Sequence, residues 1–195
     1  MKNKPVNELD PRVVKTKKSL IDAFKQLLLK YDDFMNVSVK EVCDYAGVSR
    51  KTFYLHYTQV DDLLSEVQQE YIEEFFRRTK DFDFVKDAEK VVSVYFDINE
   101  SDIVYKKAAT TSVYFFTKEA LRIKVLDYFA KNNIILSTVK LDPVVRDFLL
   151  YYYDMTLYIM YKRWVIKKYP IPKEEAIKLT AELIRNGVSS FTKAQ

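Results

Sequence analysis

Two short helix patterns joined by a glycine-containing turn lie between residues 38 and 57. Ser38 and Glu41 have the spacing of a capping box, in which a hydroxyl and a carboxylate satisfy backbone N–H groups at the start of a helix. Gly47 can take the left-handed conformation that ends a helix, and Ser49 can cap the next one. The sequence therefore predicts a helix, a tight turn and a second helix in this segment.

Each of the two predicted helices has an apolar side and a polar side. The first carries an apolar stripe at three- and four-residue spacing, formed by Val39, Val42, Cys43 and Ala46. In the second, Val48 and Phe53 can pack inward. Arg50, Lys51 and Tyr54 share another face, which is free to meet a partner. One side of the pair is therefore buried and the other is presented.

A short helix with Arg50 and Lys51 in its first turn suits the major groove of DNA, where both side chains can bind guanine edges and nearby phosphates. Neutral donors that suit phosphate oxygens occur beside them at Ser49, Thr52, Tyr54, His56 and Tyr57. The alternative is that the two cations only solvate a surface helix. The two caps, the glycine turn and the aromatic residues together favour DNA binding.

This segment resembles the N-terminal domain of the TetR family of bacterial transcriptional regulators. Three stretches carry the resemblance, namely Ala46-Gly47-Val48-Ser49, Tyr54-Leu55-His56-Tyr57 and Asp61-Asp62-Leu63. The resemblance is close over about residues 12–66 and covers the remainder only in general layout. It implies a double-stranded DNA operator as partner, a homodimer, repression of transcription and release by a small-molecule effector.

Three positions depart from the family pattern. Val60 stands where the family usually has a Lys that touches phosphate, and Phe24 stands where a small residue is usual. Asp32-Asp33 replaces the Gly that commonly ends the family's first helix. In the family the N-terminal end of that first helix often touches the DNA backbone, so the resemblance implies that Lys17 is a further DNA contact. The alternative is that Lys17 is an ordinary solvated surface residue. The predicted DNA contacts are therefore Lys17, Ser38, Ser49, Arg50, Lys51, Thr52, Tyr54, His56 and Tyr57.

Glycine and proline are scarce, with 2 Gly and 5 Pro in 195 residues, against usual frequencies of about 7% and 5%. This composition favours long helices with few connections, so we expect an all-α fold of about nine helices. Outside the segment above, helical patterns cover residues 12–30, 58–80, 84–98, 101–115, 118–132, 142–169 and 172–192. We predict a helix-turn-helix domain at residues 1–62 and a helical sensor and dimerisation domain at residues 63–195.

Charge is unevenly distributed along the chain. Residues 1–60 hold 11 Lys and Arg against 7 Asp and Glu, whereas residues 61–195 hold 21 of each class. Phosphate binding needs positive charge on the contacting face. The excess therefore agrees with a DNA-binding domain at the N-terminal end.

Other classes of function have less support. Cys43 is the single cysteine, so we expect a reducing cytoplasm and a buried small hydrophobe, with a redox sensor as the alternative. The sequence has no apolar run of about 18 residues, so we expect no membrane span. His56 is the single histidine, and no glycine-rich phosphate loop or metal-spaced cluster is present. We therefore expect no enzyme, no metal and no cofactor.

Aromatic residues are abundant after residue 90 and suit a pocket for a small molecule. The candidate effector residues are Tyr95, Tyr114, Phe115, Tyr152, Met160 and Trp164. The alternative is an ordinary filled core, in a protein that acts as an adaptor through a protein partner without an effector. A narrow stripe in the last helix pattern fits either the family's dimer interface or packing within one chain, and it comprises Ala176, Leu179, Thr180, Leu183 and Gly187.

Overall fold

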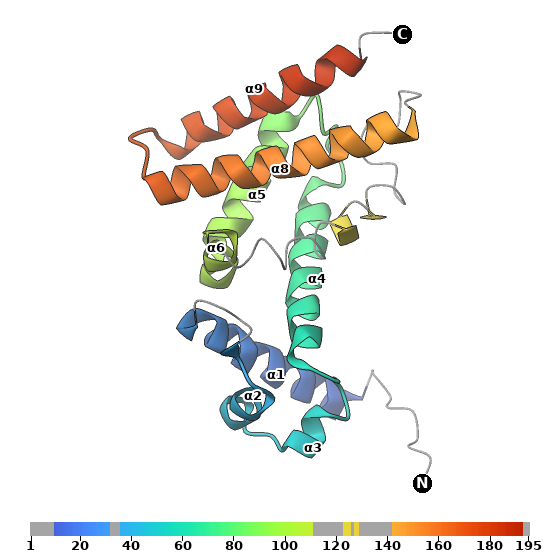
Figure 1. Ribbon diagram of the computed structural model, residues 1–195, viewed down its shortest axis with the longest axis vertical. Coiled ribbons are helices and arrows are strands. Elements are labelled where there is room, and N and C mark those ends of the chain that lie inside the picture. Colours follow the sequence, from blue (N-terminus) through green and yellow to red (C-terminus); the bar gives the residue numbers. More distant parts are fainter. Residues whose placement is uncertain (1–9, 32–35, 111–122, 126, 129–141, 193–195) are drawn as a thin grey trace. The chain divides into compact units, whose positions relative to one another are not determined.

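The computed structural model, drawn in Figure 1, describes residues 10–31, 36–110, 123–125, 127–128 and 142–192. Its regular elements are all helices within these residues: α1 (Pro11–Lys30), α2 (Val39–Ala46), α3 (Arg50–Phe53), α4 (Val60–Thr79), α5 (Ala88–Ser101), α6 (Ile103–Thr110), α8 (Pro143–Lys167) and α9 (Lys173–Thr192). Residues 123–125 and 127–128 are also helical. The remainder of the helix predicted at 118–132 lies outside the described residues. The predicted all-α fold is confirmed.

The chain divides into two compact units, Met1–Glu70 and Tyr71–Gln195. The division falls inside α4, whereas the sequence placed it at the start of that helix. The first turns of α4 therefore belong to the N-terminal unit, together with α1, α2 and α3.

The N-terminal unit is built around a small apolar core. Its fully buried side chains come from all four helices and are those of Leu20, Phe24, Leu27, Val42, Phe53 and Leu63. Phe24, which replaces the small residue of the family pattern, is 0% exposed and is part of this core. The large ring is therefore accommodated inside the unit that carries the helix-turn-helix.

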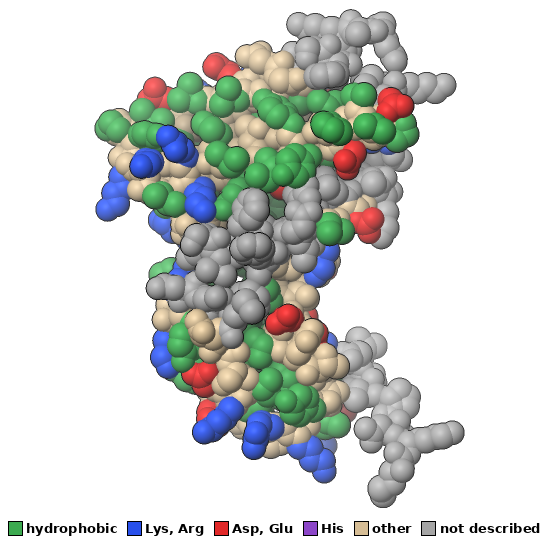
Figure 2. Space-filling view, in the orientation of Figure 1, with side chains coloured by type: hydrophobic (Ala, Val, Ile, Leu, Met, Phe, Trp, Pro, Cys, Tyr) green, Lys and Arg blue, Asp and Glu red, His purple; other side chains and the backbone are tan. Residues whose placement is uncertain are grey.

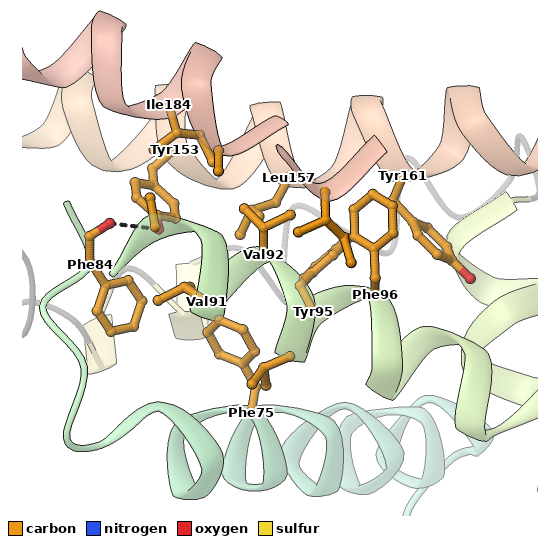
Figure 3. Close-up of a cluster of buried hydrophobic side chains, with 14 of the residues drawn as sticks. Phe75, Phe84, Val91, Val92, Tyr95, Phe96, Tyr153, Leu157, Tyr161 and Ile184 are labelled. Carbon is orange, nitrogen blue, oxygen red and sulfur yellow. Dashed lines mark hydrogen bonds between the residues drawn. The ribbon is translucent and has the colours of Figure 1, made fainter. Parts of the chain in front are cut away.

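The C-terminal unit has a larger core between α4, α5, α8 and α9, shown in Figure 3. The Tyr153 hydroxyl, on α8, donates a buried hydrogen bond to the Phe84 carbonyl at 2.8 Å. Tyr161 lies eight residues further along α8. Its ring packs edge to face on Tyr95 and Phe96 of α5, at centroid distances of 6.0 and 5.1 Å. Aromatic packing thus joins α8 to α5.

The narrow stripe predicted in α9 is divided between two environments. Ala176 and Thr180 are buried at 5% and 1% exposure, whereas Leu179 and Leu183 are 45% and 47% exposed. Gly187 faces the Tyr152 ring of α8 so closely that an added Cβ would lie 2.5 Å from the Tyr152 hydroxyl oxygen. Part of the stripe therefore packs within the chain, and the two leucines remain on the surface.

Aspartate side chains begin two helices of the C-terminal unit and hold the turn before a third. Asp142 accepts the Val144 N–H at 2.8 Å, as expected for the Asp-Pro start of α8. Asp83 accepts the N–H groups of Val85 and Lys86 at 3.0 and 2.9 Å, and this turn delays α5 to Ala88 instead of residue 84. In the same way Asp102 accepts the Val104 N–H at 2.7 Å and begins α6 two residues later than expected.

Candidate nucleic-acid interface

The helix-turn-helix has the caps that the sequence predicts. The Ser38 hydroxyl accepts the Glu41 N–H at 3.2 Å, and the Glu41 carboxylate accepts the Ser38 N–H at 3.1 Å, so the capping box is confirmed. Hydrogen bonds from the Tyr31 and Ser38 hydroxyls lower the pKa of Glu41 below its ordinary value, because they favour the carboxylate. Gly47 ends α2 in the left-handed conformation, with φ of 67°.

Helix α3 contains only four residues and depends on its neighbours for stability. The Ser49 hydroxyl accepts the Thr52 N–H at 3.0 Å and lies 2.8 Å from the Thr52 hydroxyl. On the inner side Phe53 is 0% exposed. The cap and this single buried ring therefore fix the orientation of the helix.

Arg50 and Lys51 are exposed on the outer side of α3, and neither forms an ion pair with any described residue. Tyr54, just after them, is 59% exposed. Figure 2 shows Lys and Arg side chains on the surface of the N-terminal unit near α3. The structure thus brings two unpaired cations and a phenol together on one exposed surface, which suits a phosphate backbone and base edges.

Ser38 and Ser49 are also exposed, whereas three other predicted contacts are less so. Thr52 and His56 are half-buried, and His56 Nδ1 has no hydrogen-bond partner among the described residues. Tyr57 is only 5% exposed, and its ring packs on Phe53 at 5.6 Å. The ring of Tyr57 therefore belongs to the core, and its role as a phosphate contact stays a prediction.

Lys17 lies beside this core, but its ammonium group is occupied. Lys17 Nζ is 3.0 Å from a carboxylate oxygen of Glu66 on α4, and 5.5 Å from the centre of the Tyr57 ring. A second pair one turn further along α4 joins Lys25 to Glu70. Two lysines of α1 are thus neutralised by the first turns of α4.

These turns also change the charge of the N-terminal unit. Residues 61–70 add Asp61, Asp62, Glu66 and Glu70 and no cation, so the unit Met1–Glu70 holds 11 basic and 11 acidic residues. The positive excess counted over residues 1–60 therefore disappears at the structural boundary. Positive charge in this unit is a local property of unpaired side chains such as Arg50 and Lys51.

The start of α4 carries no lysine, because Val60 is its first residue. Asp62 accepts the N–H groups of Thr58 and Gln59 at 2.6 and 3.2 Å. Partial burial raises the pKa of Asp62, but these hydrogen bonds outweigh it and hold the pKa below its ordinary value.

Sequence reasoning did not single out Lys40, an exposed cation two residues after the Ser38 cap that forms no ion pair with a described residue. Its place in a first helical turn was the available signal.

The candidate effector residues that the structure describes are Tyr95, Tyr152, Met160 and Trp164. Tyr95 and Trp164 both pack on Tyr161, at centroid distances of 6.0 and 6.3 Å. The Tyr152 hydroxyl donates to the Leu183 carbonyl on α9 at 2.7 Å. Met160 is half-buried, and Tyr114 and Phe115 lie outside the described residues.

A groove of about 750 Å³ lies elsewhere, between α5 and α9. It is lined by Phe82, Lys86, Asp87, Glu89, Lys90, Ser93, Val94, Glu174, Ile177, Lys178 and Arg185, and by none of the candidate effector residues.

No group of three potential metal ligands occurs within the described ranges. None of the described helices is long and apolar enough to cross a membrane. Cys43 is buried, and that burial raises the pKa of its thiol.

The fold has clear counterparts among solved structures, although no protein-family model matches the chain. Over 92 residues, 45% of its length, the chain is 28% identical to the HTH-type transcriptional regulator YxbF of Bacillus subtilis. The match spans only 24% of that relative. The fatty acid degradation regulator FadR from Bacillus halodurans is 16% identical with a TM-score of 0.59, covering 93% of this chain and 98% of FadR. A TetR-family regulator from Streptomyces coelicolor is 14% identical with a TM-score of 0.58, covering 91% and 80%. The chain therefore has the fold of the TetR family of transcriptional regulators.

Proposed function

We propose that the protein is a sequence-specific DNA-binding transcriptional regulator. The observation that carries the proposal is the pair of exposed cations, Arg50 and Lys51, on a helix anchored from behind by Phe53. Several other cations of the same unit are held by carboxylates, as Lys17 is by Glu66, whereas these two form no ion pair with a described residue. Unpaired Arg and Lys side chains on a rigid short helix suit guanine edges in the major groove.

The exposed apolar surface of α8 and α9 supports a homodimer. Side chains at three-, four-, seven- and eight-residue spacing along one face of α8 are 43% to 72% exposed, namely Val144, Phe148, Tyr151, Ile159 and Ile166. Leu179 and Leu183 add exposed apolar area on α9, and Figure 2 shows the hydrophobic side chains along α8. Apolar area of this extent marks a protein contact, and a second copy of the chain is the partner that closes it by symmetry.

In such a dimer the two α3 helices would enter successive major grooves of a roughly palindromic operator, with half-sites about 34–36 Å apart. Repression, and release by a small-molecule effector, are the parts of this proposal that rest on the resemblance to the TetR family alone.

The packing around Tyr161 favours a second candidate, an adaptor with a filled sensor domain. Tyr95, Phe96 and Trp164 all lie within 6.3 Å of its ring by centroid distance. A core filled in this way leaves less room for an effector, so the protein would act through a protein partner.

The test is selection of bound sequences from random duplexes, followed by affinity measurements on the enriched sequence. Arg50→Ala or Lys51→Ala should weaken binding by about 1–3 kcal/mol and relax the base preference at one position of each half-site. Lys86→Ala, an exposed cation of the C-terminal unit, is the matched control and should leave binding unchanged. Absence of any enriched sequence would refute DNA reading, and a stoichiometric protein partner without DNA affinity would establish the adaptor instead.

A further inference from the structure

We propose that Glu66 withholds Lys17 from the DNA backbone and thereby limits the affinity of the binding face. The inference rests on the proposed function, because it concerns the control of that same face. Its basis is the ion pair in which Lys17 Nζ, on α1, lies 3.0 Å from Glu66 Oε1, on α4. Both residues belong to the N-terminal unit, so the pair is internal to the domain that would bind DNA.

The position of Lys17 places it next to the DNA-reading segment. Its ammonium lies 5.5 Å from the centre of the Tyr57 ring, and that ring packs on Phe53 at the end of α3. If α3 enters a groove, a lysine beside the ring that packs on the end of α3 would lie near the duplex backbone. Its charge is therefore relevant to phosphate binding, and Glu66 cancels it.

The exposure of the pair allows exchange of partners. The side chains of Lys17 and Glu66 are 26% and 39% exposed, so water and ions reach both. Exposed ion pairs of this kind are weak. A carboxylate that already satisfies the ammonium, and that repels an approaching phosphate, nevertheless lowers the occupancy of a Lys17–phosphate contact.

The acidic residues in the first turns of α4 remove the net positive charge of the N-terminal unit. Asp61, Asp62, Glu66 and Glu70 bring its Asp and Glu to 11, equal to its Lys and Arg. Among the four, Glu66 is the residue paired with the lysine beside Tyr57. Glu70 pairs instead with Lys25, eight residues further along α1, and provides a matched control of the same chemistry.

The experiment measures the affinity of a labelled mixed-sequence duplex of about 30 base pairs, long enough for two half-sites, by fluorescence anisotropy across a salt series. The proteins are the wild-type chain, Glu66→Gln, Glu70→Gln, Lys17→Gln and the double variant Lys17→Gln with Glu66→Gln. Thermal unfolding of each variant reports whether its fold is intact.

Glu66→Gln should bind roughly two- to fivefold more tightly, the range set by the strength of an exposed ion pair. The slope of log K against log salt should steepen by about 0.9 for each protomer that gains a phosphate contact. The double variant should show no gain over Lys17→Gln, because Glu66 acts through Lys17. Glu70→Gln should match the wild type.

Three results would overturn the inference: an unchanged slope in Glu66→Gln, a gain that persists without Lys17, or an equal gain in Glu70→Gln. A purely structural role for the pair would lower the unfolding temperature of Glu66→Gln and weaken its binding, which is the opposite sign. A wild-type chain that binds no duplex at low salt would overturn the proposed function itself, whereas wild-type binding with any of the three results overturns only this inference.

Discussion

Replacing Ser49 by Ala should weaken DNA binding by removing a helix cap. The Ser49 hydroxyl accepts the Thr52 N–H at 3.0 Å, and α3 has only four residues, so no further turn compensates for the loss. Loss of a serine cap costs about 1 kcal/mol, within a range of about 0.5–2 kcal/mol. One kcal/mol is roughly a fivefold change in the ratio of formed to unformed helix. Because only the formed helix binds, the apparent Kd should rise by up to about fivefold.

The assay is equilibrium binding to the selected operator, with two further substitutions at the same position. Ser49→Thr keeps a capping hydroxyl, and Ser49→Gly as a cap loses only a few tenths of a kcal/mol. If Ser49 acts as a cap, Thr and Gly retain most of the affinity and Ala does not. Amide hydrogen exchange of Thr52 in the free protein should accelerate in the Gly and Ala variants, which both lack the hydroxyl acceptor, and stay slow in Ser49→Thr.

Equal losses in Ser49→Gly and Ser49→Ala would refute this reasoning. That outcome would mean that the hydroxyl contacts DNA directly, as the sequence pattern suggested, and that the geometry of α3 survives without it.

Three further predictions follow from the packing and the hydrogen bonds. Tyr153→Phe should lower the free energy of unfolding in urea by about 1–3 kcal/mol, because the buried Phe84 carbonyl loses its donor; Tyr158→Phe, whose hydroxyl accepts from Lys162, should lose less. Because the pKa of Glu41 is lowered in the folded protein, its carboxylate stabilises α2 fully above the ordinary pKa of 4.5, and this stabilisation is lost as pH falls through the folded pKa. Amide exchange in α2 measured against pH should report the loss, and Glu41→Gln should remove the pH dependence. Phe148→Asp should give a monomer in sedimentation, whereas Ile103→Asp, at a comparably exposed apolar site, should leave the dimer intact.

Helix boundaries in the N-terminal unit were predictable because their determinants are local. The partners of Ser38 and Ser49 lie three residues away, and Gly47 ends α2 through its own backbone conformation. Sequence pattern could not reveal contacts made across the fold. The hydroxyl of Tyr152, expected in an effector pocket, binds a carbonyl 31 residues later on α9. Periodicity identifies which side of a helix is apolar, but it does not identify the neighbour that covers it.

The charge distribution gives the clearest case of this limit. Counted by segment, residues 1–60 are positive, and this count alone predicts a DNA-binding domain there. The structure assigns residues 61–70 to the same unit, and their four carboxylates remove the excess. A neutral unit can still bind phosphate, because the field at a surface depends on which charges lie there unpaired. Lys17 and Lys25 are neutralised by α4, while Arg50 and Lys51 form no ion pair with a described residue. The proposed interface therefore depends on where the carboxylates lie: two on α4 pair with lysines of α1, and none pairs with Arg50 or Lys51 among the described residues.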